Sequence, residues 1–208
     1  MVPRRPRSYL KTLASLSRIN LMHELQQNGS MTVMELAAAT GLHHNTAREH
    51  LHRLIEAGFV CSEPIPSTSR GRPRVLYRAA TDPTDPIRRS RRHAADVRTA
   101  QYPRVLPIRE AGSSRTALDQ QLDNLDDHMI QSGFTATVEV NSLLMTMHEC
   151  PYSDLAKDNP QVCQVHFALV KDALNLTDGP LKAHALHPFS EPAVCTLDLV
   201  RERPETAV

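Results

Sequence analysis

Residues 32–59 read TVMELAAATGLHHNTAREHLHRLIEAGF, a stretch that predicts two short helices separated by a tight turn. Thr32 and Glu35 have the spacing of a capping box, so a helix should begin at this point. Gly41 favours a break in the chain, because glycine accepts the left-handed conformation that follows a helix. A further helix should run from about His43 to Ala57. Its apolar residues recur on one face: Ala47, Leu51, Leu54 and Ile55.

The flanking segments extend this pair of helices into a larger unit. Apolar residues recur at steps of three over residues 8–28, the period of an amphipathic helix, and Asn28-Gly29 should end it. Residues 59–79 predict a β-hairpin, since short apolar strands flank a loop rich in Pro, Ser, Gly and Arg. Three helices followed by a hairpin is the order of a winged helix-turn-helix, which we assign to residues 1–80.

The formal net charge of +1 hides an uneven distribution of charge along the chain. Residues 1–110 carry 18 Lys and Arg against 9 Asp and Glu, whereas residues 111–208 carry 6 against 14. The two parts therefore have formal charges of +9 and −8, which favours contact with a polyanion in the N-terminal part alone. An aromatic content of 4% without tryptophan argues against a stacking platform for single-stranded nucleic acid.

The outward face of the helix at 43–57 carries residue types that read the major groove of duplex DNA. Asn can pair with adenine through two hydrogen bonds and Arg with guanine, while the Thr methyl group can contact thymine. The predicted reading residues are His43, His44, Asn45, Thr46, Arg48, His52 and Arg53. In the hairpin loop, arginines can reach phosphates or the minor groove: Arg70, Arg72 and Arg74. The alternative is a solvated helix face and a solvated loop in an ordinary three-helix bundle.

The remaining chain predicts a linker and a second domain. Residues 81–116 have no sustained apolar period and are rich in arginine, so we expect a basic linker, helical at most between Ile87 and Ala100. Residues 117–202 should form a small α+β sensor and dimerisation domain. Its expected elements are a helix over 118–129, a hairpin over 134–148, a helix over 163–176 and strands at 181–186 and 194–199. The expected fold class is therefore α+β.

Three of the four cysteines lie in the acidic part: Cys150, Cys163 and Cys195. Cys61 falls in a predicted hairpin strand and is expected to be structural. The N-terminus does not resemble a signal peptide, and no apolar run approaches ~18 residues, so we expect free thiols in a cytoplasmic protein without a membrane span. The spacing fits neither a ferredoxin nor a zinc ribbon. Buried inert cysteines and a three-thiolate site of unknown occupant therefore both stay open.

Short motifs in the N-terminal part carry a family resemblance. They are MELA at 34–37, GL at 41–42, TAR at 46–48, AGFV at 57–60 and GRP at 71–73. Over about residues 12–80 the chain resembles the winged-helix repressors of the ArsR/DeoR-like superfamily. The resemblance implies a DNA-binding transcription regulator whose operator the sequence does not specify.

A second set of motifs lies in the acidic part: HECPY at 148–152, then Leu155-Ala156, Asn159-Pro160, Val162-Cys163 and His166. This stretch resembles the sensor domain of SufR-type regulators, cytoplasmic repressors of iron–sulfur-cluster assembly operons that bind DNA as dimers. The resemblance implies an iron–sulfur cluster, usually described as 4Fe–4S, on Cys150, Cys163 and Cys195. Some members have a further cysteine that this chain lacks. A fourth ligand would then be solvent, absent, or one of His166, Glu149, His148, His184 and His187.

Together these patterns lead to the hypothesis of a homodimeric repressor that binds a palindromic operator in double-stranded DNA and senses cluster or redox status. The first rival is a winged-helix regulator in which the same thiolates bind zinc, or a small ligand acts, without a cluster. The second rival is a thiol enzyme that uses Cys150 or Cys163 with His148 or His166. We expect no enzyme, because no motif for an oxyanion site accompanies these residues.

Overall fold

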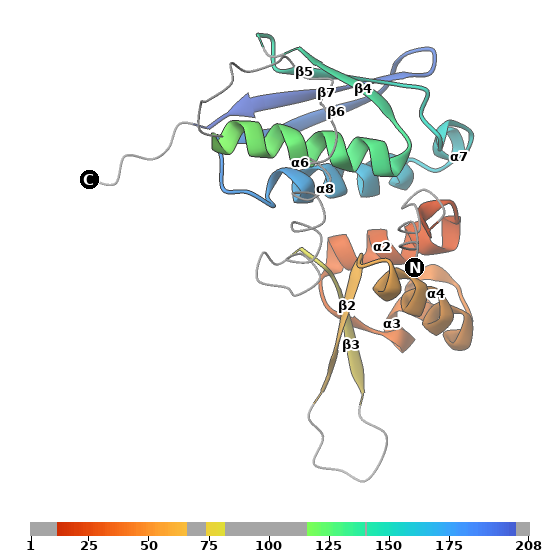
Figure 1. Ribbon diagram of the computed structural model, residues 1–208. Helices are drawn as coiled ribbons and strands as arrows, with labels where there is room; N and C mark the ends of the chain where they lie inside the picture. The colour runs from red at the N-terminus through yellow and green to blue at the C-terminus, as the bar shows by residue number, and fades with distance from the viewer. Residues whose placement is uncertain (1–11, 66–73, 82–115, 140, 203–208) are drawn as a thin grey trace, which may run out of the picture. The chain divides into compact units, whose positions relative to one another are not determined.

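The structure, a computed structural model, describes residues 12–65, 74–81, 116–139 and 141–202 (Figure 1). The chain divides into two compact units: the first is Met1–Thr81 with Asp154–Val165, and the second is Asp82–Ser153 with His166–Val208. The predicted linker helix between Ile87 and Ala100 lies outside the described residues. Helices and antiparallel sheets occur in the same chain, which confirms the predicted α+β class.

Three helices form the core of the first unit: α2 (Leu16–Asn28), α3 (Val33–Thr40) and α4 (His44–Glu56). The predicted capping box at the start of α3 is confirmed, because the Glu35 N–H donates to Thr32 Oγ1 and the Thr32 N–H donates to Glu35 Oε2. Gly41 ends α3 with a φ of 68°, the left-handed conformation expected there. The fully buried side chains of these helices are Ile19, Leu21, Met22, Leu25, Leu36, Leu51 and Leu54.

A small antiparallel sheet completes the first unit. Strands β2 (Val60–Pro64) and β3 (Val75–Ala79) pair along their whole length, which confirms the predicted hairpin. Strand β1 (Met31–Thr32) lies on the other side of β3, so the strand order is β1-β3-β2. Strand β1 was not predicted, because two residues are too few to show an alternating pattern and the partner strand lies far along the chain.

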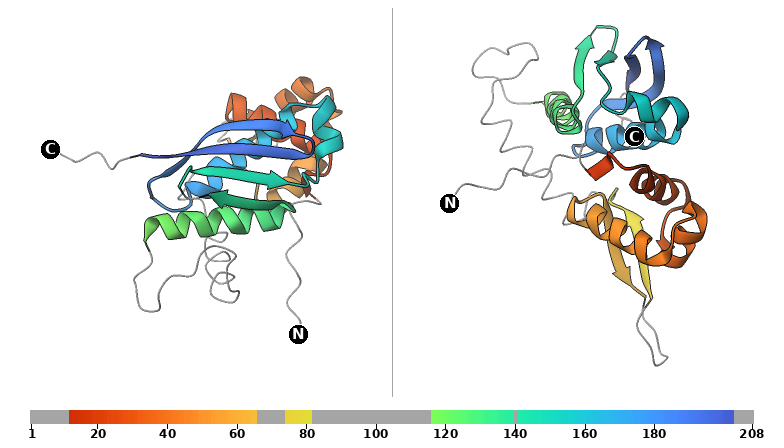
Figure 2. Two further views of the ribbon diagram at one scale, coloured as in Figure 1. Left: turned by 90° about the horizontal axis from the view of Figure 1, so that it is seen from above. Right: turned by 90° about the vertical axis from the view of Figure 1, so that its right-hand side faces the viewer.

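The second unit contains a four-stranded antiparallel sheet and two helices. Its strands lie in the order β4 (Thr135–Glu139), β5 (Leu144–His148), β7 (Val194–Arg201) and β6 (Leu181–Glu191). Helix α6 (Ala117–Ser132) and the part of α8 (Gln161–Leu174) from His166 onward lie on one face of this sheet (Figures 1 and 2). The buried residues of the two central strands are Met145, Met147, Cys195, Leu197 and Leu199.

A buried amide joins three elements of the second unit. Gln121 on α6 is fully buried, and its Nε2 donates to the carbonyl oxygens of Leu174 and Leu181 at 3.1 and 3.0 Å. Its Oε1 accepts from the Leu181 N–H at 2.8 Å. A Cβ atom at Gly179 would collide with the Gln121 side chain. The amide therefore fixes α6 to the end of α8 and to the start of β6.

Besides β1, four elements differ from the sequence-based expectation. Helix α2 begins at Leu16, whereas a helix was expected over residues 8–28, because Ser15 has an extended backbone conformation. Helix α7 (Ser153–Asp158) was not predicted, because six residues do not reveal a helical period. Helix α8 begins at Gln161 rather than Cys163, directly after Pro160, a residue that suits the start of a helix. Strand β6 continues to Glu191 with irregular register, five residues beyond the predicted end. No helix within the described ranges is both long and apolar enough to cross a membrane.

Candidate nucleic-acid interface and cysteine site

Helix α4 presents a polar face to solvent. Ala47, Leu51 and Leu54 have no exposed surface, and their burial determines which side of the helix points outward. The exposed residues of the predicted reading set are His43, Asn45, Thr46, Arg48, His52 and Arg53, and His44 is half-buried. The structure thus brings all seven predicted residues of this segment together at one end and along one face of α4.

The start of α4 is held by its own polar side chains. His43 is the N-cap residue, and its Nδ1 accepts a hydrogen bond from the Asn45 N–H at 3.3 Å. The rings of His43 and His44 lie 4.2 Å apart between centroids. Arg48 Nη1 donates to Asn45 Oδ1 at 3.2 Å, so the guanidinium and the amide are oriented as a pair. These are the two side-chain types that form two hydrogen bonds with guanine and adenine, respectively.

The second half of α4 carries ion pairs on its surface. Arg53 Nη2 lies 3.1 Å from Glu49 Oε1, and His52 Nδ1 lies 3.7 Å from Glu56 Oε1. All four side chains are more than half exposed, so these pairs contribute at most about 1 kcal/mol each. Because the pairs are weak, Arg53 can exchange its contact with Glu49 for a phosphate group at little cost.

Arg18 and His50 were absent from the predicted site, although they lie beside Arg53. Burial lowers the pKa of His50, and the positive charges of Arg18 and Arg53 lower it further, whereas Glu49 opposes them. His50 is therefore neutral at neutral pH and adds no charge to the basic surface. No sequence signal marks Arg18, because an arginine in an amphipathic helix ordinarily occupies the solvated face.

The structure describes one of the three arginines of the hairpin loop. Arg74 is exposed at the start of β3, and Arg70 and Arg72 lie outside the described residues. Hydrogen bonds from the Thr32 backbone and side chain lower the pKa of Glu35, and the charge of Arg74 lowers it further. Arg74 is thus electrostatically coupled to the first turn of α3, within the same unit as α4.

The sequence of the first unit is similar to that of a known domain family. Residues 13–62, from the N-terminal side of α2 to the first residues of β2, match a family model described as a helix-turn-helix domain. The first unit contains a helix-turn-helix domain. The chain matches none of the curated proteins. A helix-turn-helix domain supports a DNA-binding transcription regulator, in which α4 holds the position of the helix that enters the major groove.

The position of Arg48 in the helix-turn-helix domain leads to a prediction. Arg48→Ala is expected to weaken binding to a duplex selected by the wild-type protein from a random pool, because an arginine that bonds a base twice contributes about 1–3 kcal/mol, roughly tenfold in affinity or more. Fluorescence anisotropy at one fixed salt concentration measures the change. Arg201→Ala, which removes the same charge from an exposed position in β7, is the matched control. An equal loss on selected and random duplexes would contradict a role in base reading.

Cys150 and Cys195 lie at the same end of the second sheet. Cys150 follows β5 by two residues, and Cys195 pairs with Met147 of that strand. Cys195 is buried and Cys150 is half-buried, and both are free thiols. Burial raises the pKa of the Cys150 thiol, a hydrogen bond from the Tyr152 N–H opposes this shift, and the charge of Cys195 adds to it. The two sulfur atoms are therefore close enough to interact electrostatically.

The backbone around these two cysteines is unusual in two respects. The Phe189 N–H donates to Cys195 Sγ at 3.4 Å, and the Tyr152 N–H donates to the sulfur of Cys150. Glu149, Phe189 and Ala193 have φ values of 54°, 54° and 62°, the left-handed region that costs about 1–3 kcal/mol for residues other than glycine. Strained backbone tends to occur at functional sites. Hydrogen-bond donors to sulfur also occur at metal-bound thiolates, where they adjust the reduction potential of the metal centre.

Cys163 belongs to the other of the two compact units. It is half-buried near the start of α8, in the segment that belongs to the first unit. Within the described ranges, no three side chains among His, Cys, Asp and Glu form a group that could hold a metal ion. The structure thus brings Cys150 and Cys195 near each other within the second unit. Cys61 is buried in β2, the position expected for a structural residue.

The candidates for a fourth ligand differ in their surroundings. His166 stacks on Phe134 at 4.2 Å between ring centroids, and its Nε2 is buried without a hydrogen-bond partner among the described residues. Burial lowers the pKa of His166 to about 4, so its ring is neutral at neutral pH. His187 Nε2 lies 2.8 Å from Asp198 Oδ2. The other candidates are His148, which is half-buried, and Glu149 and His184, which are exposed.

Proposed function

We propose that the protein is a transcription repressor that senses iron–sulfur-cluster or redox status through Cys150, Cys163 and Cys195. The helix-turn-helix domain supplies the DNA-binding part. The sensing role is supported by one observation above all: Cys150, just beyond the end of β5, and Cys195, near the start of the neighbouring β7, lie at the same end of the sheet, and each sulfur accepts a backbone N–H. Motifs between His148 and His166, which include Cys150 and Cys163, carry the resemblance to SufR-type regulators.

The donor chemistry suits a soft metal centre, since thiolates are the ligands that iron–sulfur clusters and zinc prefer. A bound cluster would supply an oxidation-sensitive link among three thiolates. Cys150 and Cys195 would hold it at the end of the sheet, and the N–H groups of Tyr152 and Phe189 would stabilise their negative charge. A three-thiolate site would take its third ligand from Cys163.

We propose that the protein acts as a homodimer on a palindromic operator. Two helix-turn-helix domains related by a two-fold axis read half-sites about one helical turn, roughly 10 base pairs, apart. The acidic composition of residues 111–208 supports a role for this part away from the DNA.

We also propose that Cys150 is not the nucleophile of a thiol enzyme. A catalytic cysteine needs a thiolate at neutral pH and therefore a lowered pKa. Burial raises the pKa of the Cys150 thiol, which is the opposite shift.

The sensing proposal is tested by anaerobic purification with analysis of iron, acid-labile sulfide and zinc. We expect iron and sulfide in the wild-type protein and their loss in Cys150→Ala, Cys163→Ala and Cys195→Ala, because each substitution removes one thiolate. The metal-free variants should bind the selected duplex as the metal-free wild-type protein does, since the cysteines lie outside the reading helix. Cys61→Ala, which removes a thiol in β2, is the matched control and should keep the cluster.

Two results would overturn the sensing proposal. A colourless wild-type protein that contains zinc and no sulfide would favour the rival zinc site. Equal affinity of the cluster-loaded and metal-free forms for the selected duplex would show that loading does not control DNA binding.

A further inference from the structure

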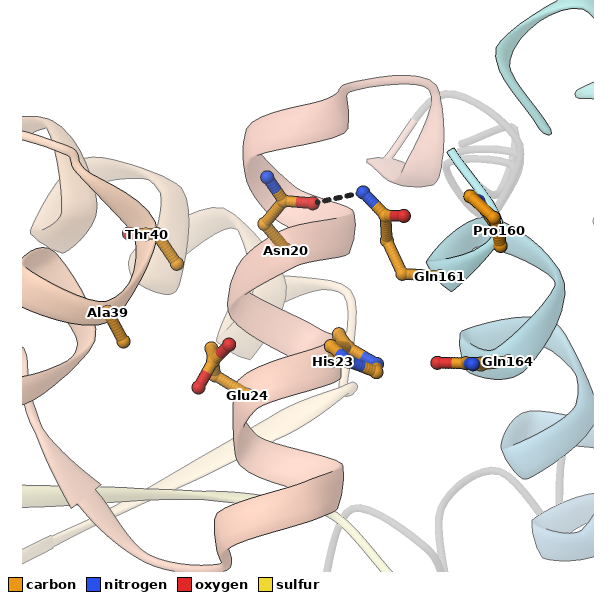
Figure 3. A pocket seen from close by; sticks show the side chains of 8 residues that line it. All are labelled: Asn20, His23, Glu24, Ala39, Thr40, Pro160, Gln161 and Gln164. Carbon is orange, nitrogen blue, oxygen red and sulfur yellow. Dashed lines mark hydrogen bonds between the residues drawn. The ribbon is translucent and has the colours of Figure 1, made fainter. Parts of the chain in front are cut away.

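The first unit contains a contact between the helix-turn-helix domain and a segment far along the chain. Residues Asp154–Val165, which include the first five residues of α8, belong to this unit. Gln161 is the first residue of α8, and its Nε2 donates to Asn20 Oδ1 on α2 at 3.2 Å (Figure 3). Because α2 packs against both α3 and α4, a change at Asn20 acts on the framework that holds the reading helix.

A polar cavity of about 370 Å³ adjoins this hydrogen bond. Its polar side chains come from α2, α3 and α8, and they are Asn20, His23, Glu24, Thr40, Gln161 and Gln164 (Figure 3). Nδ1 of His23 is buried and has no hydrogen-bond partner among the described residues. Polar walls of this kind are bridged by water rather than close-packed. The start of α8 can therefore shift against α2 at lower cost than an element held by an apolar core.

Cys163 lies between the two glutamines that line this cavity. Gln161 precedes it by two residues and Gln164 follows it directly, and the Cys163 N–H donates to the Pro160 carbonyl at 3.0 Å. All three residues lie in the first turns of one helix, whose backbone hydrogen bonds keep their Cα positions in a fixed relation. Any displacement of Cys163 therefore moves Gln161 and Gln164 with it.

We propose that the first turn of α8 is the element that couples the chemical state of Cys163 to the helix-turn-helix domain. In one state Gln161 is bonded to Asn20, and in the other, with Cys163 ligated or modified, this bond is lost and α2 is released. The inference rests on the proposed sensing function and deepens it by naming the contact through which sensing acts. The hydrogen bond between Gln161 and Asn20, formed in one state and lost in the other, is the two-state element that coupling between two sites requires.

The test compares the wild-type protein with Asn20→Ala and Gln161→Ala as full-length chains. Iron and sulfide per chain are measured first, and then the affinity of the loaded and metal-free forms for the selected duplex. We expect loading to change the affinity of the wild-type protein by about tenfold, a common size for coupling between sites. Both variants should load the cluster normally and bind the duplex with nearly the same affinity in the two forms. Gln120→Ala, at an exposed position on α6, should behave as the wild-type protein does.

The possible outcomes distinguish a failure of the coupling proposal from a failure of the sensing proposal. Variants that load the cluster and keep the full tenfold change would overturn the coupling and leave the sensing proposal intact. If the wild-type protein takes up no cluster, the sensing proposal fails, and the coupling is then tested with N-ethylmaleimide. Alkylation of Cys163, measured against Cys163→Ala treated in the same way, should alter the duplex affinity of the wild-type protein but not of Asn20→Ala. An equal effect in both proteins would overturn the coupling.

Discussion

Gln121→Ala is expected to lower the free energy of unfolding of the second unit by about 3 kcal/mol or more, because three hydrogen bonds to backbone groups are lost and each unsatisfied buried group costs about 1–3 kcal/mol. The groups concerned are the carbonyl oxygens of Leu174 and Leu181 and the Leu181 N–H, and they meet around a side chain with no exposed surface. Urea unfolding followed by circular dichroism measures the loss.

Amide exchange localises the effect of this substitution. Faster exchange is expected in α6, at the end of α8 and at the start of β6, because Gln121 joins these three elements. Gln120→Ala changes the neighbouring glutamine, which is exposed, and should leave the unfolding midpoint nearly unchanged. Equal midpoints for the two variants would show that the buried amide contributes no more than its exposed neighbour.

Leu51→Ala is expected to lower the stability of the helix-turn-helix domain by about 2–5 kcal/mol, the usual cost of removing a buried leucine side chain. Leu51 has no exposed surface and lies on the face of α4 that packs into the first unit. Native domains have free energies of unfolding of about 5–15 kcal/mol, so this loss removes a large share of the stability and lowers the melting temperature. Binding to the selected duplex should fall with the folded fraction.

Leu16→Ala makes the same substitution in the same unit, at a half-buried position at the start of α2. It should lower the stability of the domain clearly less than Leu51→Ala does. Thermal unfolding and fluorescence anisotropy measured on the same samples distinguish a role of Leu51 in the core from a role in contact with DNA. Loss of duplex binding at unchanged stability would mean that Leu51 acts on the DNA rather than in the core.

Local sequence signals predicted the first unit well. The capping box at Thr32, the end of α3 at Gly41 and the buried face of α4 depend on residues within a few positions of one another, so a pattern is enough to find them. The hairpin of β2 and β3 was predicted for the same reason. Strand β1 was missed, because Met31 and Thr32 become a strand only through pairing with Tyr77 and Leu76.

The cysteine site shows the limit of such signals. Its residue types and the spacing of Cys150 and Cys163 are visible in the sequence. The hydrogen bond from Phe189 to Cys195 depends on a left-handed residue in the β6–β7 hairpin, and no residue preference marks it, since phenylalanine rarely adopts this conformation. The bond between Asn20 and Gln161 joins residues from opposite ends of the sequence, which periodicity does not relate.

The buried amide of Gln121 has a consequence for how this sequence can change over time. A Cβ atom at position 179 would occupy the space of the Gln121 side chain, so the two positions share one volume. A mutation of Gly179 becomes acceptable only after residue 121 has become smaller, and that first step already removes three hydrogen bonds. Glutamine at 121 and glycine at 179 should therefore be retained or replaced together among descendants of this chain.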